Sequence, residues 1–186
     1  MKYNIEWLHH ELGKDKRIKY LHFWGNKPEK GGTIGAGCLS QWWGGHTFRE
    51  AGLFYPTAEH YMMAGKAKLF ADPENLDKIL QASSPAEAKK WGREVRGFEA
   101  KLWTQHRCEI VVAGNYLKFS QNEALRDYLL GTQDRVLVEA SPVDPIWGIG
   151  LAKDDPRAHE PYAWRGKNLL GFCLMEVRDR LQLAGV

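Results

Sequence analysis

Alternating or continuous runs of apolar residues predict several short strands in this chain. β-Branched and aromatic residues make 18–24 the first of them, and apolar residues at every second position make 136–140 the last. Between them, 39–43 and 47–55 have the same character, and Glu50-Ala51-Gly52 breaks the second of these with a turn. The strands are few and short, so any sheet they form is small.

Apolar residues at helical spacing occupy most of the remaining chain, and capping residues mark where helices begin. Thr57, Asp72 and Ser84 each stand at the start of such a segment. The predicted helices cover about 58–70, 73–81, 85–95, 99–118, 120–130 and 168–183. This pattern predicts an α+β fold, a predominantly helical single domain around a small β-sheet. We expect residues 1–17 to form a short leader and 18–186 to form the domain.

Composition narrows the class of protein. The chain has 186 residues, 44% of them hydrophobic, which is enough for one well-packed domain. A formal charge of +3 does not by itself call for a polyanionic partner. Three scattered cysteines and the polar N-terminus predict reduced thiols, no signal peptide and a cytoplasmic location. No run is apolar for the length of a membrane span, so we expect no membrane partner.

Two charged residues lie on the apolar face of the helix predicted after Thr57. Glu59, Met62, Met63 and Lys66 stand at i, i+3, i+4 and i+7 and therefore share that face. Ionised side chains are seldom directed inward without a partner or a function. Two other interpretations stay open. Glu59 could serve only the positive end of the helix dipole, and Lys66 could extend to solvent or pair with Glu59.

Several motifs, in order along the chain, resemble the signature of the NADAR family, which includes the YbiA-type N-glycosidases. They cover roughly 20–181 of the sequence. The motifs are Leu39-Ser40-Gln41-Trp42, 55–63, Lys66-Ala67, Gly92-Arg93, Trp103, Lys118-Phe119, 139–144, 147–150 and 166–171. The long segments 25–37 and 151–165 depart from the shorter YbiA-type pattern.

The resemblance implies a small α+β domain that hydrolyses an N-glycosidic bond to a phosphorylated ribose. Known members act on two substrate classes: ADP-ribosylated guanine in nucleic acid, and early riboflavin-pathway intermediates that yield ribose 5-phosphate. The larger rim formed by the two long segments favours ADP-ribose. A non-catalytic sensor of ADP-ribose or NAD is the alternative from a different class.

Cleavage of such a bond builds positive charge on the ribose, which a carboxylate beside C1 stabilises. Glu59 is the first catalytic candidate, and Asp144 is the second, with a turn residue as its simpler interpretation. Lys66 could bind phosphate, keep Glu59 ionised, or attack the sugar as an amine.

Further residues of the motifs are candidates for substrate binding. Trp147, beside Gly148, could stack on a planar base, with a core tryptophan as the alternative; Trp24 and Trp42 are weaker candidates. Phosphate could be held by Lys167 and Asn168 before the last helix, by Arg93, or by Lys118. We expect His60 to support its neighbours by hydrogen bonding.

The expected partner is a nucleotide-like small molecule with an ADP-ribose or ribose 5-phosphate moiety. ADP-ribosylated nucleic acid is a further candidate, because lysines and arginines alternate with Trp91 and Trp103 between 89 and 107. Helical spacing spreads those charges around an axis, which is more typical of a solvated surface. No metal and no cofactor are expected. The oligomeric state leaves no mark on the sequence.

Overall fold

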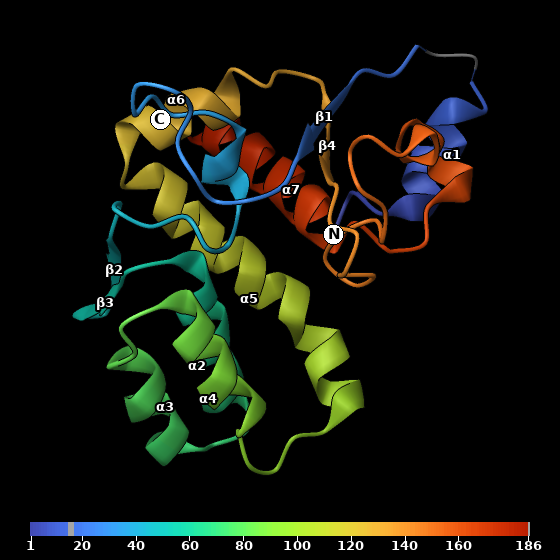
Figure 1. Cartoon of the computed structure of the whole chain (residues 1–186). Helices are drawn as coiled ribbons and strands as arrows, with labels where there is room; N and C mark the ends of the chain where they lie inside the picture. Colours follow the sequence, from blue (N-terminus) through green and yellow to red (C-terminus); the bar gives the residue numbers. More distant parts are fainter. Residues whose placement is uncertain (15–16, 186) are drawn as a thin grey trace. The chain divides into compact units, whose positions relative to one another are not determined.

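The computed structural model describes residues 1–14 and 17–185. They form two compact units. Unit 1 is built from the two ends of the chain, Met1–Ser40 and Ala124–Val186, and unit 2 is the continuous segment Gln41–Glu123. Figure 1 colours the elements by their place in the sequence.

Unit 2 is organised around helix α2 (Ala58–Leu69), which packs against α3 (Pro73–Leu80), α4 (Pro85–Arg93) and α5 (Ala100–Ser120) (Figure 1). Its start follows from the local sequence, because the Thr57 hydroxyl accepts a hydrogen bond from the backbone N–H of His60. Eight of its twelve residues are buried. A helix that is buried on nearly all sides has little apolar–polar contrast between its faces.

Capping residues also start α3 and α4 as predicted. Asp72 accepts a hydrogen bond from the N–H of Asn75, and Ser84 accepts one from the N–H of Glu87. In both helices proline occupies the first position, where the missing N–H is not needed. The helix predicted for 99–118 is the longest described, with 21 residues.

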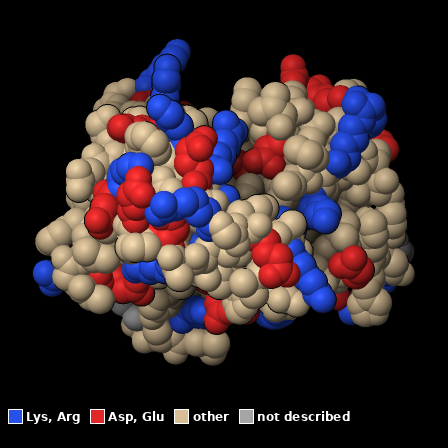
Figure 2. All heavy atoms as spheres, turned by 90° about the horizontal axis from the view of Figure 1, so that it is seen from below, with Lys and Arg blue, Asp and Glu red and all other residues tan. Residues whose placement is uncertain are grey.

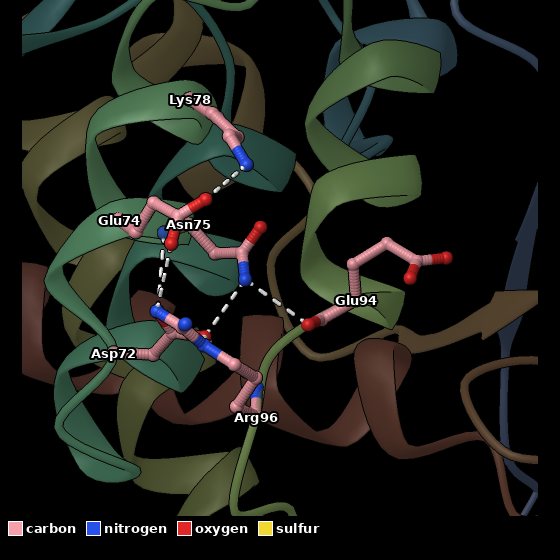
Figure 3. A network of polar contacts seen from close by, with 6 residues as sticks. All are labelled: Asp72, Glu74, Asn75, Lys78, Glu94 and Arg96. Carbon is pink, nitrogen blue, oxygen red and sulfur yellow. Dashed lines mark hydrogen bonds and ion pairs between the residues drawn. The ribbon is translucent and has the colours of Figure 1, made fainter.

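A polar network joins the start of α3 to the chain that leaves α4, as Figure 3 shows. The Asp72 carboxylate, almost completely buried, accepts hydrogen bonds from Asn75 and from the backbone and guanidinium of Arg96. These donors hold the pKa of Asp72 well below its usual range, the Arg96 side chain having the largest effect. The Asn75 amide also donates to the carbonyl of Glu94, and Glu74 pairs with Lys78.

The segment predicted as a strand broken by a turn, 47–55, is a hairpin in unit 2. Strands β2 (Phe48–Glu50) and β3 (Leu53–Tyr55) are antiparallel, with Phe48 opposite Tyr55. Ala51 and Gly52 both have positive φ angles, 49° and 81°, as a two-residue turn of type I′ requires. The turn predicted at Glu50-Ala51-Gly52 is therefore confirmed, although alanine is uncommon at such a φ.

Unit 1 contains the other sheet, a parallel pair of β1 (Tyr20–Phe23) and β4 (Val136–Glu139). Tyr20 pairs with Val136 and Phe23 with Glu139. Helix α7 (Leu169–Ala184) packs on β4 and buries Phe172, among others (Figure 1). Its approach is close, because a Cβ atom at Gly171 would overlap the carbonyl oxygen of Leu137. This glycine lets α7 lie directly on the strand.

The segment 39–43 does not form the predicted strand, and one helix was not predicted. Part of the predicted leader is the helix α1 (Ile5–Leu12), whose start is capped by the Asn4 side chain. The strand predicted for 39–43 is wrong, since the short 3₁₀ helix η1 (Ala36–Leu39) ends there and the chain then turns. The N–H of Ser40 bonds to the carbonyl of Gly37, a local bond that satisfies the backbone without a partner strand.

The remaining elements of unit 1 are α6 (Glu123–Leu130) and the 3₁₀ helices η2 (Pro156–His159) and η3 (Pro161–Ala163). The described chain is thus α+β and predominantly helical, which confirms the predicted fold class. The division into a leader and one domain from residue 18 remains a prediction. Within residues 1–14 and 17–185, no helix combines the length and the apolar character needed to cross a membrane.

Candidate functional site

Glu59 occupies the first turn of α2 and is buried, with only 3% of its surface exposed. Its backbone N–H donates to the carbonyl of Gln41 at 2.9 Å. Two residues thus bind N–H groups in the first turn of α2, the capping residue Thr57 and the more distant Gln41. A carboxylate in the first turn of a helix is stabilised by the helix dipole.

His60 supports this end of the helix, as predicted from its position. Its Nδ1 lies 2.8 Å from the Thr57 hydroxyl and its Nε2 lies 3.1 Å from the carbonyl of Ala82. Because a carbonyl only accepts, Nε2 carries the proton and Nδ1 accepts from the hydroxyl. Burial lowers the pKa of His60, which keeps the ring neutral and this arrangement intact.

Helix α5 contributes a buried polar stripe to the same unit. Arg107, Val111, Asn115 and Lys118 follow one another at spacings of four, four and three residues, so they share a face. Asn115 is fully buried and Lys118 is 1% exposed. The Asn115 amide donates to the Gln41 side chain at 2.6 Å, so the α2 N-terminus and this stripe meet at Gln41. Lys118 lies one turn beyond Asn115 and places its Nζ 4.9 Å from the centre of the Phe119 ring.

Lys66 is half-buried, and its ammonium has specific neighbours. Its Nζ donates to the carbonyl of Gly92 at 2.6 Å and lies 4.3 Å from the ring centre of Phe98. The Trp103 ring centre is 5.9 Å away. Burial lowers the pKa of Lys66, whereas the carbonyl and the rings favour the ammonium form. Gly92 permits this approach of α4 to α2, because a Cβ there would overlap the side chain of Met63.

The other predicted residues of unit 2 lie nearer the surface. Arg93 is exposed at the last position of α4. Trp42 is half-buried, and the ammonium of Lys89 lies 5.8 Å from its ring centre. Unit 2 thus contains Glu59, Lys66, Arg93, Lys118 and Trp42.

Asp144 of unit 1 has the local contacts of a turn residue. Its Oδ1 accepts hydrogen bonds from the N–H groups of Ile146, at 2.9 Å, and Trp147, at 2.8 Å. This is the simpler of the two interpretations that the sequence left open, although it engages only one carboxylate oxygen. Trp147 is half-buried in the same turn. The turn fixes the Asp144 carboxylate relative to the backbone of Trp147.

The segment around Gly148 and Asn168 is a compact backbone structure. Asn168 is fully buried with a φ of 52°, and its amide donates to the carbonyl of Leu137 and accepts from the N–H of Glu139, each at 2.9 Å. Its N–H donates to the carbonyl of Gly148. Both polar atoms of the Asn168 side chain, which was predicted to bind phosphate, are therefore hydrogen-bonded to the backbone of β4. Lys167 beside it is exposed, as is Trp24, at 60%.

The basic side chains of segment 89–107 differ in their burial and in their contacts. Arg96 pairs with Asp72, Arg107 is buried, and the ammonium of Lys90 lies 4.8 Å from the ring centre of Trp91. Figure 2 shows lysine and arginine interspersed with aspartate and glutamate on the face that it presents. This distribution is typical of a solvated surface.

A separate cavity of about 430 Å³ lies in unit 2 between α2, α5 and the hairpin. Tyr55, Tyr61 and Ile110 are among its lining residues, and none of the predicted site residues is. Within the described part of the chain, His, Cys, Asp and Glu form no group of three or more that could hold a metal ion.

Reasoning from the sequence missed Gln41, Asn115 and Phe98. Gln41 belongs to the Leu39–Trp42 motif, which could have drawn attention to it. Asn115 shares a face of α5 with Arg107 and Lys118, so no apolar pattern in the sequence indicated its burial. Phe98 gave no signal, because it lies in a loop.

The chain as a whole is similar to known proteins. A family model described as NADAR domain matches residues 22–182. The chain is 43% identical over 173 residues to N-glycosidase R617 of Acanthamoeba polyphaga mimivirus, covering 88% of this chain and 97% of that protein. It is 35% identical over 132 residues to riboflavin biosynthesis protein VVA0006 of Vibrio vulnificus, covering 71% of this chain and 32% of that protein.

Another relative, YbiA, has a solved structure. N-glycosidase YbiA of Escherichia coli K12 is 34% identical over 132 residues, covering 71% of this chain and 74% of that protein. Its NMR structure aligns with a TM-score of 0.70 and 28% identity, covering 91% of this chain and 89% of YbiA.

Proposed function

Because the chain belongs to the NADAR family, we propose that it is a hydrolase that cleaves the bond between ribose C1 and an exocyclic amine of a base. The observation that carries the proposal is the buried carboxylate of Glu59 at the start of α2. In the reaction the C1–N bond breaks and the water oxygen bonds to C1. One water proton goes to the departing nitrogen, and the other stays on the new hydroxyl.

Glu59 is the catalytic group in this proposal. Its carboxylate stabilises the positive charge that develops on the ribose, or accepts the proton of the attacking water. Burial strengthens either effect, since an interaction between charges is larger away from bulk water. Asp144 is the second carboxylate, with Oδ1 held by backbone N–H groups and its turn carrying Trp147 as a stacking surface.

Lys66 is proposed as a catalytic residue. Two variants distinguish a role as nucleophile from a role as a positive charge. Lys66→Arg keeps the positive charge but removes the nucleophilic amine, and Lys66→Met removes both. If the amine attacks the sugar, both variants lose activity alike. If the charge holds phosphate or keeps Glu59 ionised, Lys66→Arg retains much more activity than Lys66→Met. Arg93, Lys118 and Lys167 are proposed phosphate ligands, and Trp24 and Trp42 are additional stacking surfaces.

The proposed substrate is an ADP-ribosyl compound, with ADP-ribosylated guanine in DNA as the leading case. The proposal of a large ligand is supported by the long segments 25–37 and 151–165 of unit 1. The second of these segments contains η2 and η3. The second candidate is an early riboflavin-pathway intermediate that yields ribose 5-phosphate. It is supported by the relative named as a riboflavin biosynthesis protein.

The test measures release of ADP-ribose from a modified guanine oligonucleotide and of ribose 5-phosphate from the aminopyrimidine intermediate. We expect Glu59→Gln, which keeps the side-chain shape, to lower kcat by about 10²-fold or more while ADP-ribose still binds. Glu87→Gln is the matched control, because Glu87 also lies in the first turn of a helix of unit 2. Tight binding of ADP-ribose without turnover of either substrate would refute the hydrolase and identify a sensor.

A further inference from the structure

Gln41 lies among three contacts at the start of α2. Its backbone carbonyl accepts the N–H of Glu59 at 2.9 Å, and its side-chain oxygen accepts from the amide of Asn115 at 2.6 Å. Its side-chain nitrogen points to the sulfur of Met62, 3.9 Å away. Gln41 is 6% exposed, so its conformation is determined by these protein contacts rather than by water.

Asn115 is itself fixed by the helix that carries it. It is fully buried in α5, and its amide nitrogen donates to the Val111 carbonyl at 2.9 Å as well as to Gln41. Both amide hydrogens are therefore used. The orientation of the amide follows from the α5 backbone, which makes it a rigid reference point for Gln41.

These contacts connect α5 to the backbone of the candidate catalytic residue in two steps. Asn115 orients Gln41, and Gln41 binds the N–H of Glu59 itself. That N–H is one of the first four of α2, which have no partner within the helix. The contact therefore restricts the backbone from which the carboxylate projects.

Simple packing would not require this arrangement. Two apolar side chains could fill the same space without the cost of desolvating two amides. Buried amides that are hydrogen-bonded to each other instead favour one geometry over its neighbours. A displacement of about 1 Å at a reacting group can cost about 10²-fold in rate, so such a geometry matters most beside a catalytic carboxylate.

We propose that Gln41 is a positioning residue that fixes the Glu59 carboxylate for reaction, and that Asn115 acts through Gln41. This inference rests on the proposed function. It extends that function from the carboxylate to the elements that hold it, and it assigns Gln41 no contact with the substrate.

The test compares Gln41→Met with Gln121→Met. Methionine has a similar length but makes neither amide contact, and Gln121 lies in the same unit, bonded to the backbone of Arg49 rather than to α2. We expect Gln41→Met to lower kcat by about 10- to 100-fold with KM changed less than threefold, and to shift the acid limb of the kcat–pH profile. Gln121→Met should leave kcat, KM and the pH profile unchanged. Rates are expressed per folded molecule, from thermal unfolding curves.

Asn115→Asp is the second variant, in case Gln41→Met does not fold, and it replaces the donor with an acceptor. We expect the same split between kcat and KM. Lower thermal stability with an unchanged kcat and pH profile in the folded variants would overturn the positioning role. If Glu59→Gln is inactive while Gln41→Met and Asn115→Asp are fully active, only this inference fails. A fully active Glu59→Gln would refute the catalytic role of Glu59 together with this inference, whereas the absence of turnover by the wild-type protein is what refutes the proposed function.

Discussion

Replacing Gly171 with alanine tests the close approach of α7 to β4. Gly171 is buried in the first turns of α7, where a Cβ atom would overlap the carbonyl oxygen of Leu137. The same Cβ would lie 2.7 Å from both polar atoms of the Asn168 amide. Neither neighbour can move freely, because one is strand backbone and the other is hydrogen-bonded to that strand.

The expected cost follows from three effects. Without a clash, alanine in a helix interior is about 1 kcal/mol more stable than glycine. Overpacking a buried contact costs about 1–3 kcal/mol. Displacing Asn168 weakens two hydrogen bonds, to Leu137 and Glu139, at about 1 kcal/mol each. The net loss is about 2–4 kcal/mol of unfolding free energy, which lowers Tm by roughly 4–16 °C in a chain of this length.

Thermal and urea unfolding of Gly171→Ala measure this loss, with Gly13→Ala as the control. Gly13 ends α1 with an ordinary φ of −66°, and a Cβ there would make only normal contacts, the nearest at 3.5 Å. Gly13→Ala should therefore leave Tm unchanged or raise it slightly. If Gly171→Ala also raises Tm, α7 does not lie on β4 as closely as described, and the reasoning is refuted.

Two further predictions concern pH. Donors from Arg96 keep the Asp72 carboxylate ionised in the folded state. The resulting stabilisation is present above the ordinary aspartate pKa and is lost as pH falls through the lowered pKa of Asp72 in the folded state. Arg96→Gln should therefore be less stable than wild type in urea at pH 7, with the difference shrinking as pH is lowered from about 4 to 2; a constant difference over that range would contradict this. Burial lowers the pKa of His60, so its contribution is present above the ordinary histidine pKa of about 6.5 and lost as pH falls below it. Between pH 7.5 and 5, His60→Gln should lose less unfolding free energy than wild type, whereas equal losses would show that His60 does not titrate in this way.

Local interactions made much of unit 2 predictable. The starts of α2, α3 and α4 follow from Thr57, Asp72 and Ser84, because a capping side chain acts on an N–H only two or three residues away. The burial of Glu59 followed from the period of the apolar residues around it.

Long-range contacts explain what the sequence did not predict. The carbonyl that binds Lys66 belongs to Gly92, on another helix, and the amide that holds Gln41 belongs to Asn115. Neither partner follows from spacing along the chain. The segment 39–43 has strand-like composition, yet it has no partner strand, and β propensity depends on such partners.

The parallel pairing of β1 with β4 has a consequence for biosynthesis. These strands belong to segments that flank all of Gln41–Glu123, so the ribosome must finish that intervening stretch before they can meet. Ordering a loop of such length delays the pairing, whereas the helices around α2 need only contiguous chain. During translation, unit 2, which contains Glu59, is thus expected to fold while the second segment of unit 1, which contains Asp144, has not yet been synthesised.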